Sequence, residues 1–259
     1  MDERIRRRRW RSWIPPVLGV LAVLVTVSAA AARPVAAAYQ GTADSNESAF
    51  EPPCIGWDDP HPERMLTLAV SGMKALGYDV TGYKGAPVTR AHVLSRTVGD
   101  WAYYVHSHGD YYWHSGDQRR YSGFREDSGD CVQSVVFSKD IKGKRDGRQT
   151  NLVVISTCSN GDANTTMPGA FGITKSKAGE LAWNGPKFYL GYVGEAYDND
   201  EETFEVTFWD ALKRGKGVGP AFELAMLESF THNSFDADWW GSYVWSGRAG
   251  PGGTCPSCV

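Results

Sequence analysis

The sequence predicts an α/β protein with a mainly parallel central sheet flanked by helices. The first observation is that short apolar runs, too short for helices of usual length, end abruptly at polar residues. Such runs are typical of strands buried on both faces, which occur in parallel sheets covered by helices. The second observation is that segments with helical spacing alternate with these runs. This alternation predicts right-handed crossover connections between parallel strands.

The chain begins with a segment typical of an exported protein. Arg4–Arg11 is a basic stretch, Val17–Ala32 is apolar and uncharged, and Ala36–Ala38 is a small-residue site. This pattern predicts a signal peptide at residues 1–38, with cleavage before Tyr39. The alternative is an N-terminal membrane anchor that is not cleaved, because Ile14–Ala32 is just long enough to span a bilayer. In either case the rest of the chain lies outside the cytoplasm, and in the first case it is secreted.

The remainder divides by composition into a linker, one domain and a tail. Residues 39–62 are rich in Gly, Ser, Asn, Asp and Pro and are expected to be a linker or pro-segment. One domain is expected at 63–245, followed by an irregular tail at 246–259 that contains Gly, Pro and Cys. Within the domain, helical spacing predicts helices at 63–76 and 89–97. Strands are predicted at 78–83, 101–105, 132–137 and 152–155. The acids at 198–202 are expected to open another helix, where carboxylates suit the helix dipole, rather than to bind calcium.

Two of the predicted strands lead into residues that could carry chemistry. The strand at 101–105 is followed by His106-Ser-His108-Gly-Asp110, and the strand at 152–155 leads to Cys158. In open α/β sheets, ligands bind beyond the carboxyl ends of the strands. We therefore predict that Cys158 is a nucleophile and that His108 is its acid/base partner. The alternative for Cys158 is a buried, inert thiol.

The cysteine count supports one free thiol. The chain has five cysteines, and an odd number in an exported protein leaves one unpaired. Cys158 follows a buried strand, whereas the other four lie in loop-like or terminal contexts and are expected to form disulfides. Four cysteines permit three connectivities. One of them joins Cys255 to Cys258 and Cys54 to Cys131.

The pairs His108-Gly109 and Thr157-Cys158 resemble the pattern of the caspase-like cysteine peptidases, which include caspases, gingipains, separases and CHAT-domain proteins. Their shared pattern is a strand ending in His-Gly, then a strand ending in a small residue and Cys. Cys158 follows His108 by 50 positions, a spacing similar to that of caspases. The segments 188–208 and 215–225 look like the later strand, helix and final helix of gingipain-like and CHAT members. Thr157 departs from the Ala or Ser that often precedes the cysteine.

The resemblance implies a three-layer α/β/α sandwich and a cysteine endopeptidase that hydrolyses peptide bonds in peptides or proteins, and the export segment would make this enzyme secreted. It implies an oxyanion hole made by the backbone N–H groups of Gly109 and Cys158. A protonated His108 is expected to help keep the thiol ionised. Asp162 and Glu195 are candidates for a pocket that takes Arg or Lys. No cofactor is expected, apart from calcium as a structural ion, and a net charge of −3 gives no case for nucleic-acid binding.

Two other functions remain open from the sequence. His106, His108 and Asp110 resemble the start of the metallo-β-lactamase pattern, which would make the chain a zinc hydrolase. The next residue departs from that pattern, because Tyr111 stands where a further histidine is needed. Alternatively the domain is a non-catalytic binding module, since ten tryptophans and twelve tyrosines suit a recognition surface. In the peptidase interpretation His106 is an ordinary hydrogen-bonded histidine, and its replacement should cost far less activity than that of His108.

Overall fold

The structure is a computed structural model that describes residues 35–40, 62–84, 87–126, 135–145, 150–173, 188–196, 198–233 and 237–241. The chain divides into two units, Met1–Ala32 and Arg33–Val259, and all of the described residues belong to the second unit. The predicted tail and the cysteines other than Cys158 lie outside the described residues.

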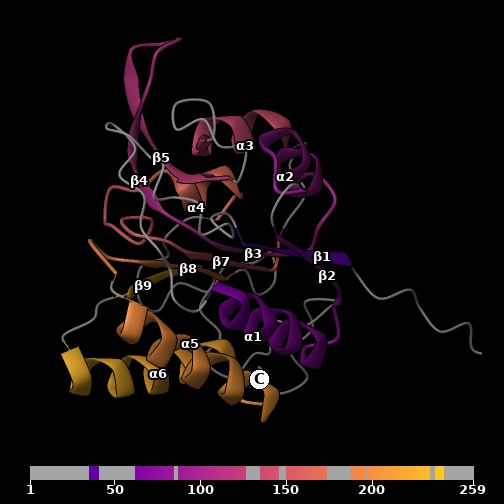
Figure 1. Cartoon of the computed structure of the whole chain (residues 1–259), viewed down its shortest axis with the longest axis vertical. Helices are drawn as coiled ribbons and strands as arrows, with labels where there is room; N and C mark the ends of the chain where they lie inside the picture. Colours follow the sequence, from indigo (N-terminus) through magenta and orange to yellow (C-terminus); the bar gives the residue numbers. More distant parts are fainter. Residues whose placement is uncertain are drawn as a thin grey trace, which may run out of the picture. The chain divides into compact units, whose positions relative to one another are not determined.

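The core of the domain is a six-stranded sheet with the strand order β2-β1-β3-β7-β8-β9 (Figure 1). The first five strands in this order run parallel to one another, and β9 pairs antiparallel with β8 at one edge. The strands are β1 (Val35–Gln40), β2 (Asp79–Lys84), β3 (Ala102–His106), β7 (Leu152–Ser156), β8 (Phe188–Tyr192) and β9 (Ala237–Gly241).

Helices cover both faces of this sheet. One face packs against α1 (Pro62–Ala75), α5 (Asp198–Lys213) and α6 (Val218–Asn233). The other packs against α2 (Arg90–Thr97), α3 (Ser138–Lys144) and α4 (Met167–Ala170) (Figure 1). Strand residues alternate between the two cores: Tyr104 and Val154 lie on the α5 side, and Tyr103 and Val153 on the α2 side. The predicted α/β/α sandwich with a mainly parallel sheet is confirmed.

The helix boundaries follow from local chemistry that the sequence displays. The Thr89 hydroxyl caps α2 by accepting a hydrogen bond from the His92 N–H over 3.3 Å. Gly77 follows α1 with φ at 95°, the left-handed conformation that favours glycine after a helix. The acids at 198–202 open α5, as predicted, and the later helix is α6.

The first strand corrects the predicted domain boundary. Val35–Gln40 is β1, which lies between β2 and β3, and Ala36 to Tyr39 are fully buried. Cleavage before Tyr39 would therefore cut a central strand, and the domain begins at or before Val35 rather than at residue 63. The prediction failed because alanine is a weak strand former, and an alanine run after an apolar segment matches a cleavage site.

The segment between β3 and β7 forms a second, antiparallel sheet. It contains β4 (Gly109–His114), β5 (Arg119–Arg125) and β6 (Val135–Phe137), in the order β4-β5-β6. The β4–β5 hairpin stands at the upper left of Figure 1. Of these three strands, the sequence predicted the one at 132–137, which corresponds to β6. Because β4 begins at Gly109, the hairpin starts directly beside the site described below.

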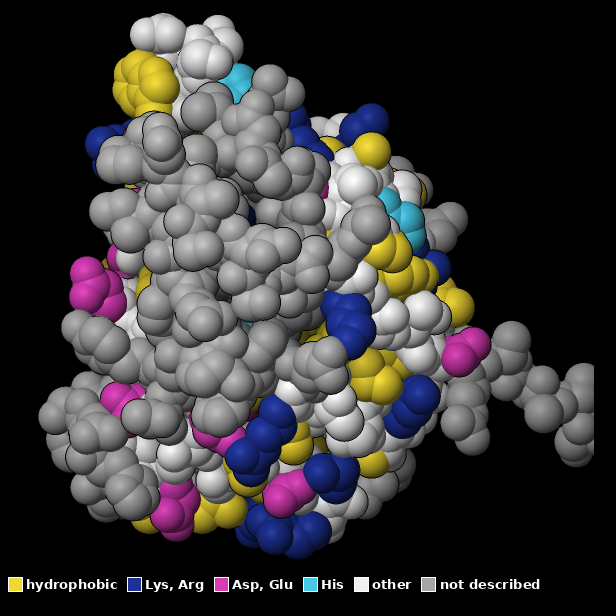
Figure 2. All heavy atoms as spheres, in the orientation of Figure 1, with side chains coloured by type: hydrophobic (Ala, Val, Ile, Leu, Met, Phe, Trp, Pro, Cys, Tyr) yellow, Lys and Arg dark blue, Asp and Glu magenta, His cyan; other side chains and the backbone are white. Residues whose placement is uncertain are grey.

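The described surface carries mixed charge. In Figure 2 acidic and basic side chains are interspersed over the described part of the visible face. No helix within the described ranges combines the length and the apolar character needed to cross a membrane. The apolar segment at 17–32 lies outside those ranges.

Candidate active site

Strands β3 and β7 are neighbours in the sheet, and their carboxyl ends meet at one edge. His106 is the register partner of Ser156. The pairing continues one step further, because the Ser107 N–H donates to the Ser156 carbonyl over 3.2 Å. His108 and Cys158 each follow this register pair by two positions. The parallel register therefore places the backbone positions of the two predicted catalytic residues at the same edge of the sheet.

Gly109 packs directly against the loop that carries Cys158. A Cβ atom built on Gly109 would lie 2.4 Å from the Thr157 Oγ1, 2.5 Å from the Cys158 carbonyl oxygen and 2.6 Å from the Asn160 Nδ2. Real Cβ atoms do not approach other heavy atoms so closely, so this position excludes any side chain. The His108-Gly109 pair is thus in contact with the Cys158 loop, and glycine is needed there for close approach of the backbone.

The Cys158 thiol is free and partly buried. Its Sγ accepts a hydrogen bond from the Ala196 N–H over 3.4 Å and lies 3.9 Å from the Ala196 carbonyl oxygen. Burial raises the pKa of the Cys158 thiol, the Ala196 N–H lowers it, and the charges of Glu201 and Glu195 raise it again. The net direction is upward, so these surroundings favour the neutral thiol. This differs from the expected thiolate, chiefly because the sequence did not show how far the sulfur is buried.

A tight turn follows the cysteine and is held by Asn160. Ser159 has φ at 59°, a left-handed conformation that reverses the chain at the end of β7. The buried Asn160 side chain donates from Nδ2 to the Thr157 Oγ1 over 2.6 Å, to the Gly123 carbonyl over 3.0 Å and to the Cys158 carbonyl over 3.3 Å. These bonds tie the cysteine loop to β5 as well as to itself. Asn160 is therefore one of the groups that hold the backbone of Cys158 in place.

The same loop is also joined to the chain that follows β8. The Ser159 N–H donates to the Gly194 carbonyl over 2.8 Å, and the Gly161 N–H donates to the Tyr192 carbonyl over 2.6 Å. A Cβ atom on Gly161 would lie 2.2 Å from the Gly191 carbonyl oxygen, so the two backbones touch without side chains between them. This contact holds the segment after β8, which contains Ala196, against the thiol.

The two candidate pocket acids differ in their surroundings. Asp162 is half-buried, and its Oδ1 accepts a hydrogen bond from the Gly194 N–H over 2.8 Å. It therefore ties the two loops together. Glu195 is exposed and lies near enough to Cys158 for its charge to oppose ionisation of the thiol. Of the two, Glu195 is the acid that faces solvent beside the sulfur.

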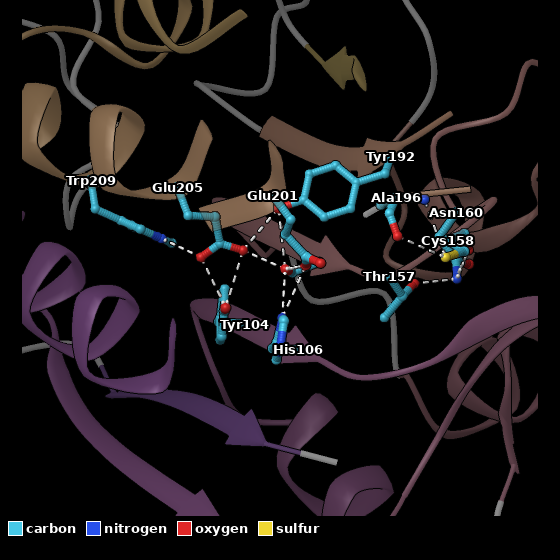
Figure 3. A network of polar contacts seen from close by, with 11 residues as sticks. Tyr104, His106, Thr157, Cys158, Asn160, Tyr192, Ala196, Glu201, Glu205 and Trp209 are labelled. Atoms are coloured by element: carbon cyan, nitrogen blue, oxygen red, sulfur yellow. Dashed lines mark hydrogen bonds and ion pairs between the residues drawn. The ribbon is translucent and has the colours of Figure 1, made fainter. Parts of the chain in front are cut away.

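A buried polar network lies on the α5 side of the same strand ends (Figure 3). The Ser156 hydroxyl lies 2.5 Å from Glu201 Oε1 and also contacts Glu205 Oε1. His106 Nδ1 lies 3.1 Å from the Ser156 Oγ and 3.0 Å from Glu201 Oε1. The other carboxylate, Glu205, accepts hydrogen bonds from three further side chains, which are those of Tyr104, Tyr192 and Trp209.

This network bears on the alternative zinc site. The partners of His106 come from β7 and α5, whereas the exposed Asp110 accepts from the N–H of Tyr111 over 2.6 Å. His106 and Asp110 therefore have separate partners and do not face the common metal position that the zinc interpretation requires. Among the described residues, the group that could offer metal ligands is instead His106, Glu201 and Glu205, whose ligand atoms lie within 4.8 Å of one another.

Sequence reasoning missed Asn160, which holds the Cys158 loop, and the two buried glutamates that contact Ser156. For Asn160 the signal was the Ser-Asn-Gly run after a buried strand, which is typical of a tight turn. For Glu201 and Glu205 it was the i, i+4 spacing within a helix that also carries Phe204, Phe208 and Trp209. Acids among large aromatics on one helix indicate buried rather than capping carboxylates.

Comparisons with known proteins show similarity at the level of solved structures. No family model matches the chain, and no curated protein matches it. Three similar solved structures are a complex of the pro- and mature domains of Porphyromonas gingivalis RgpB, a Geobacter sulfurreducens protein from a structural genomics programme, and caspase-1 of Spodoptera frugiperda. Their identities are 12%, 14% and 8%, and their TM-scores are 0.49, 0.46 and 0.49.

The matches cover 83–84% of this chain. They cover 48%, 98% and 92% of the three proteins, so this chain spans about half the length of RgpB. RgpB, a gingipain, and caspase-1 belong to the caspase-like group that the sequence resembles. What the site can do is argued below from its own residues.

Proposed function

We propose that this chain is a secreted cysteine peptidase that hydrolyses peptide bonds with Cys158 as nucleophile and His108 as acid/base. The observation that carries the proposal is the meeting of β3 and β7 at one edge, with Gly109 in contact with the Cys158 loop. A free thiol, a histidine and a side-chain-free backbone segment are the parts that acyl transfer needs. The resemblance of the sequence to caspase-like peptidases agrees with this assignment.

The chemistry begins with a neutral thiol, because the surroundings raise the pKa of Cys158, chiefly through burial. His108 takes the thiol proton as the sulfur attacks the peptide carbonyl carbon, so it acts first as a general base. The carbonyl oxygen becomes an oxyanion, which the N–H groups of Gly109 and Cys158 would stabilise. His108 then gives its proton to the leaving amine, and the C–N bond breaks to leave a thioester. Water attacks the thioester, passes a proton through His108 and releases the acid and the thiol.

The substrate is a peptide or protein. Glu195, exposed beside the thiol, would attract a positively charged residue of that substrate. A cationic substrate group near Glu195 would also offset the charge that opposes ionisation of Cys158. Asp162 is a second candidate at the same pocket, although its carboxylate is engaged with the Gly194 N–H.

The test is cleavage of a peptide library by the purified domain. Cys158→Ala and His108→Ala should each abolish cleavage, because members of a catalytic unit are not additive. His114→Ala is the matched histidine control, since it lies at the far end of β4 from Gly109, about 17 Å along the strand. Retained cleavage in Cys158→Ala would reject the peptidase mechanism. Absence of cleavage in the wild type across the library would favour a binding module.

A further inference from the structure

The Ser156 hydroxyl is the meeting point of the buried network. It contacts one carboxylate oxygen from each of two glutamates, which lie one turn apart on α5. Ser156, Glu201 and Glu205 have exposed fractions of 0%, 5% and 0%, so water does not separate these oxygens. Two carboxyl groups therefore share one hydroxyl inside the core, two residues before Cys158.

A count of hydrogens shows that these contacts need one proton more than ionised glutamates would supply. Each short O–O contact requires a hydrogen between the two oxygens. Ser156 has a single hydroxyl hydrogen, which can occupy only one of its two contacts with the glutamates. The hydroxyls of Tyr104 and Tyr192 and the indole N–H of Trp209 already donate to Glu205. The second hydrogen must then belong to a carboxyl group.

A metal ion does not explain the arrangement equally well. His106, Glu201 and Glu205 have ligand types that suit a divalent cation. However, the Ser156 Oγ lies among these three ligand atoms, at 3.1 Å from His106 Nδ1 and 2.5 Å from Glu201 Oε1. It therefore takes the central place that a cation would need.

Charge balance agrees with a bound proton. Two ionised glutamates beside one histidine would leave net negative charge in a fully buried site, which is strongly unfavourable. With one proton on the glutamate pair and a protonated His106, the network is neutral. Burial raises the pKa of Glu205, His106 lowers it, and the charge of Glu201 raises it further. In such a coupled pair the proton belongs to both groups together.

We propose that Glu201 and Glu205 together bind one proton through Ser156 at neutral pH, and that this proton clamps α5 to the end of β7 that carries Cys158. Loss of the proton would put two carboxylates on one hydroxyl, and one of them would have to leave. The parts held by the clamp are Ser156 and the start of α5, the segment that follows Ala196. The inference does not depend on the proposed peptidase activity.

Several titratable or polar groups face the glutamate pair or lie beside it. From β3 these are Tyr104 and His106, from β8 Tyr192, and from α5 Trp209. The nearby ionisable groups at the sheet edge are Cys158 and Glu195. The neighbours of Glu201 along α5 are Asp200, which is buried, and Glu202, which is half-buried and pairs with Arg64 of α1.

Infrared difference spectroscopy of the folded, full domain tests the bound proton directly. The wild type at pH 7 should show the carbonyl stretch of one neutral carboxyl group, and this band should disappear as the pH rises. Glu201→Gln and Glu205→Gln should each abolish the band, because the new amide N–H can donate the hydrogen that the contact with Ser156 needs, and the remaining glutamate can then stay ionised beside His106. Glu223→Gln, which removes an exposed acid from α6, is the matched control and should keep the band.

Three outcomes would overturn the proposal. One is a wild-type spectrum at pH 7 without the neutral carboxyl band, which needs no variant to fold. Another is a band that survives in Glu201→Gln, because that would place the proton on Glu205 independently of its neighbour. The third is a stoichiometric divalent cation in the purified protein that Glu201→Gln releases.

Stability against pH gives a second readout. Because burial raises the folded pKa of Glu205 above the ordinary glutamate value of about 4.3, the stabilisation that its proton gives is complete below that value. This stabilisation is lost as the pH rises through the raised pKa of the folded protein. The melting temperature of the wild type should therefore fall over that interval, and the hydrogen-exchange protection of the end of β7, measured relative to the unfolded chain at the same pH, should decrease. Glu201→Gln should flatten this dependence, whereas an unchanged slope in that variant would reject the clamp.

Discussion

Replacement of Gly109 by alanine tests whether the contact between the His108-Gly109 segment and the Cys158 loop is as tight as the structure shows. The added methyl would meet three atoms at 2.4–2.6 Å, and one of them is the backbone carbonyl oxygen of Cys158. A flexible side-chain end could rotate away, but a backbone carbonyl can move only with its loop. That loop is held by Asn160 and by the bonds to Gly194 and Tyr192. Rotation of a side chain alone therefore cannot relieve the clash with the added methyl group.

The size of the effect follows from the closeness of the contact. Forcing a methyl group into a filled site typically costs about 1–3 kcal/mol. For a domain of this size, each kcal/mol lowers the melting temperature by roughly 2–4 °C, so a loss of roughly 2–12 °C is expected. A shift of the cysteine loop by about 1 Å should also reduce peptide cleavage about 10²-fold. Gly99→Ala is the matched control, because its Cβ would meet no atom within 4 Å.

The assay is thermal unfolding of both variants, followed by the rate of Cys158 alkylation with iodoacetamide and by peptide cleavage. Gly99→Ala should match the wild type in all three measurements. Gly109→Ala should unfold at lower temperature and show an altered alkylation rate, whether or not the domain is a peptidase. If Gly109→Ala were as stable and as reactive as Gly99→Ala, the close packing of the two loops would be refuted.

Three further predictions follow from individual residues. A chain that starts at Arg33 should fold, whereas one that starts at Tyr39 should not, because it lacks most of β1; circular dichroism of the two would show equal folding if this is wrong. Burial raises the pKa of Asp100 to about 6, against the opposing charge of Arg96. Stability should therefore decline as the pH rises from about 4 through 6, and Asp100→Asn should remove that part of the slope, so an identical slope in both proteins would contradict it. The Cys158 thiol should alkylate slowly at pH 7 and faster above its raised pKa, and a rate that levels off by neutral pH would contradict the effect of burial.

The parts of the fold that the sequence predicted are those whose pattern is local. The run at 152–155 is apolar throughout and became β7, because a strand covered on both faces needs no polar residue. Thr89 and Gly77 marked helix ends through their own capping chemistry. The strand at Val35–Gln40 was missed because its alanines have no strand preference of their own, and only the neighbouring strands give them a place in the sheet.

The candidate site also has features that the sequence shows locally and features that depend on the fold. The linear pattern was enough to show that a histidine and a cysteine follow two buried strands, since strand ends and reactive side chains are visible in it. The folded chain was needed to show that β3 and β7 are neighbours in register, that Glu201 lies near the thiol, and that Ser156 joins two glutamates. The physical reason is that a pKa and a shared proton depend on burial and on charges brought together from distant segments. Those distances arise only when helix α5 packs against the sheet.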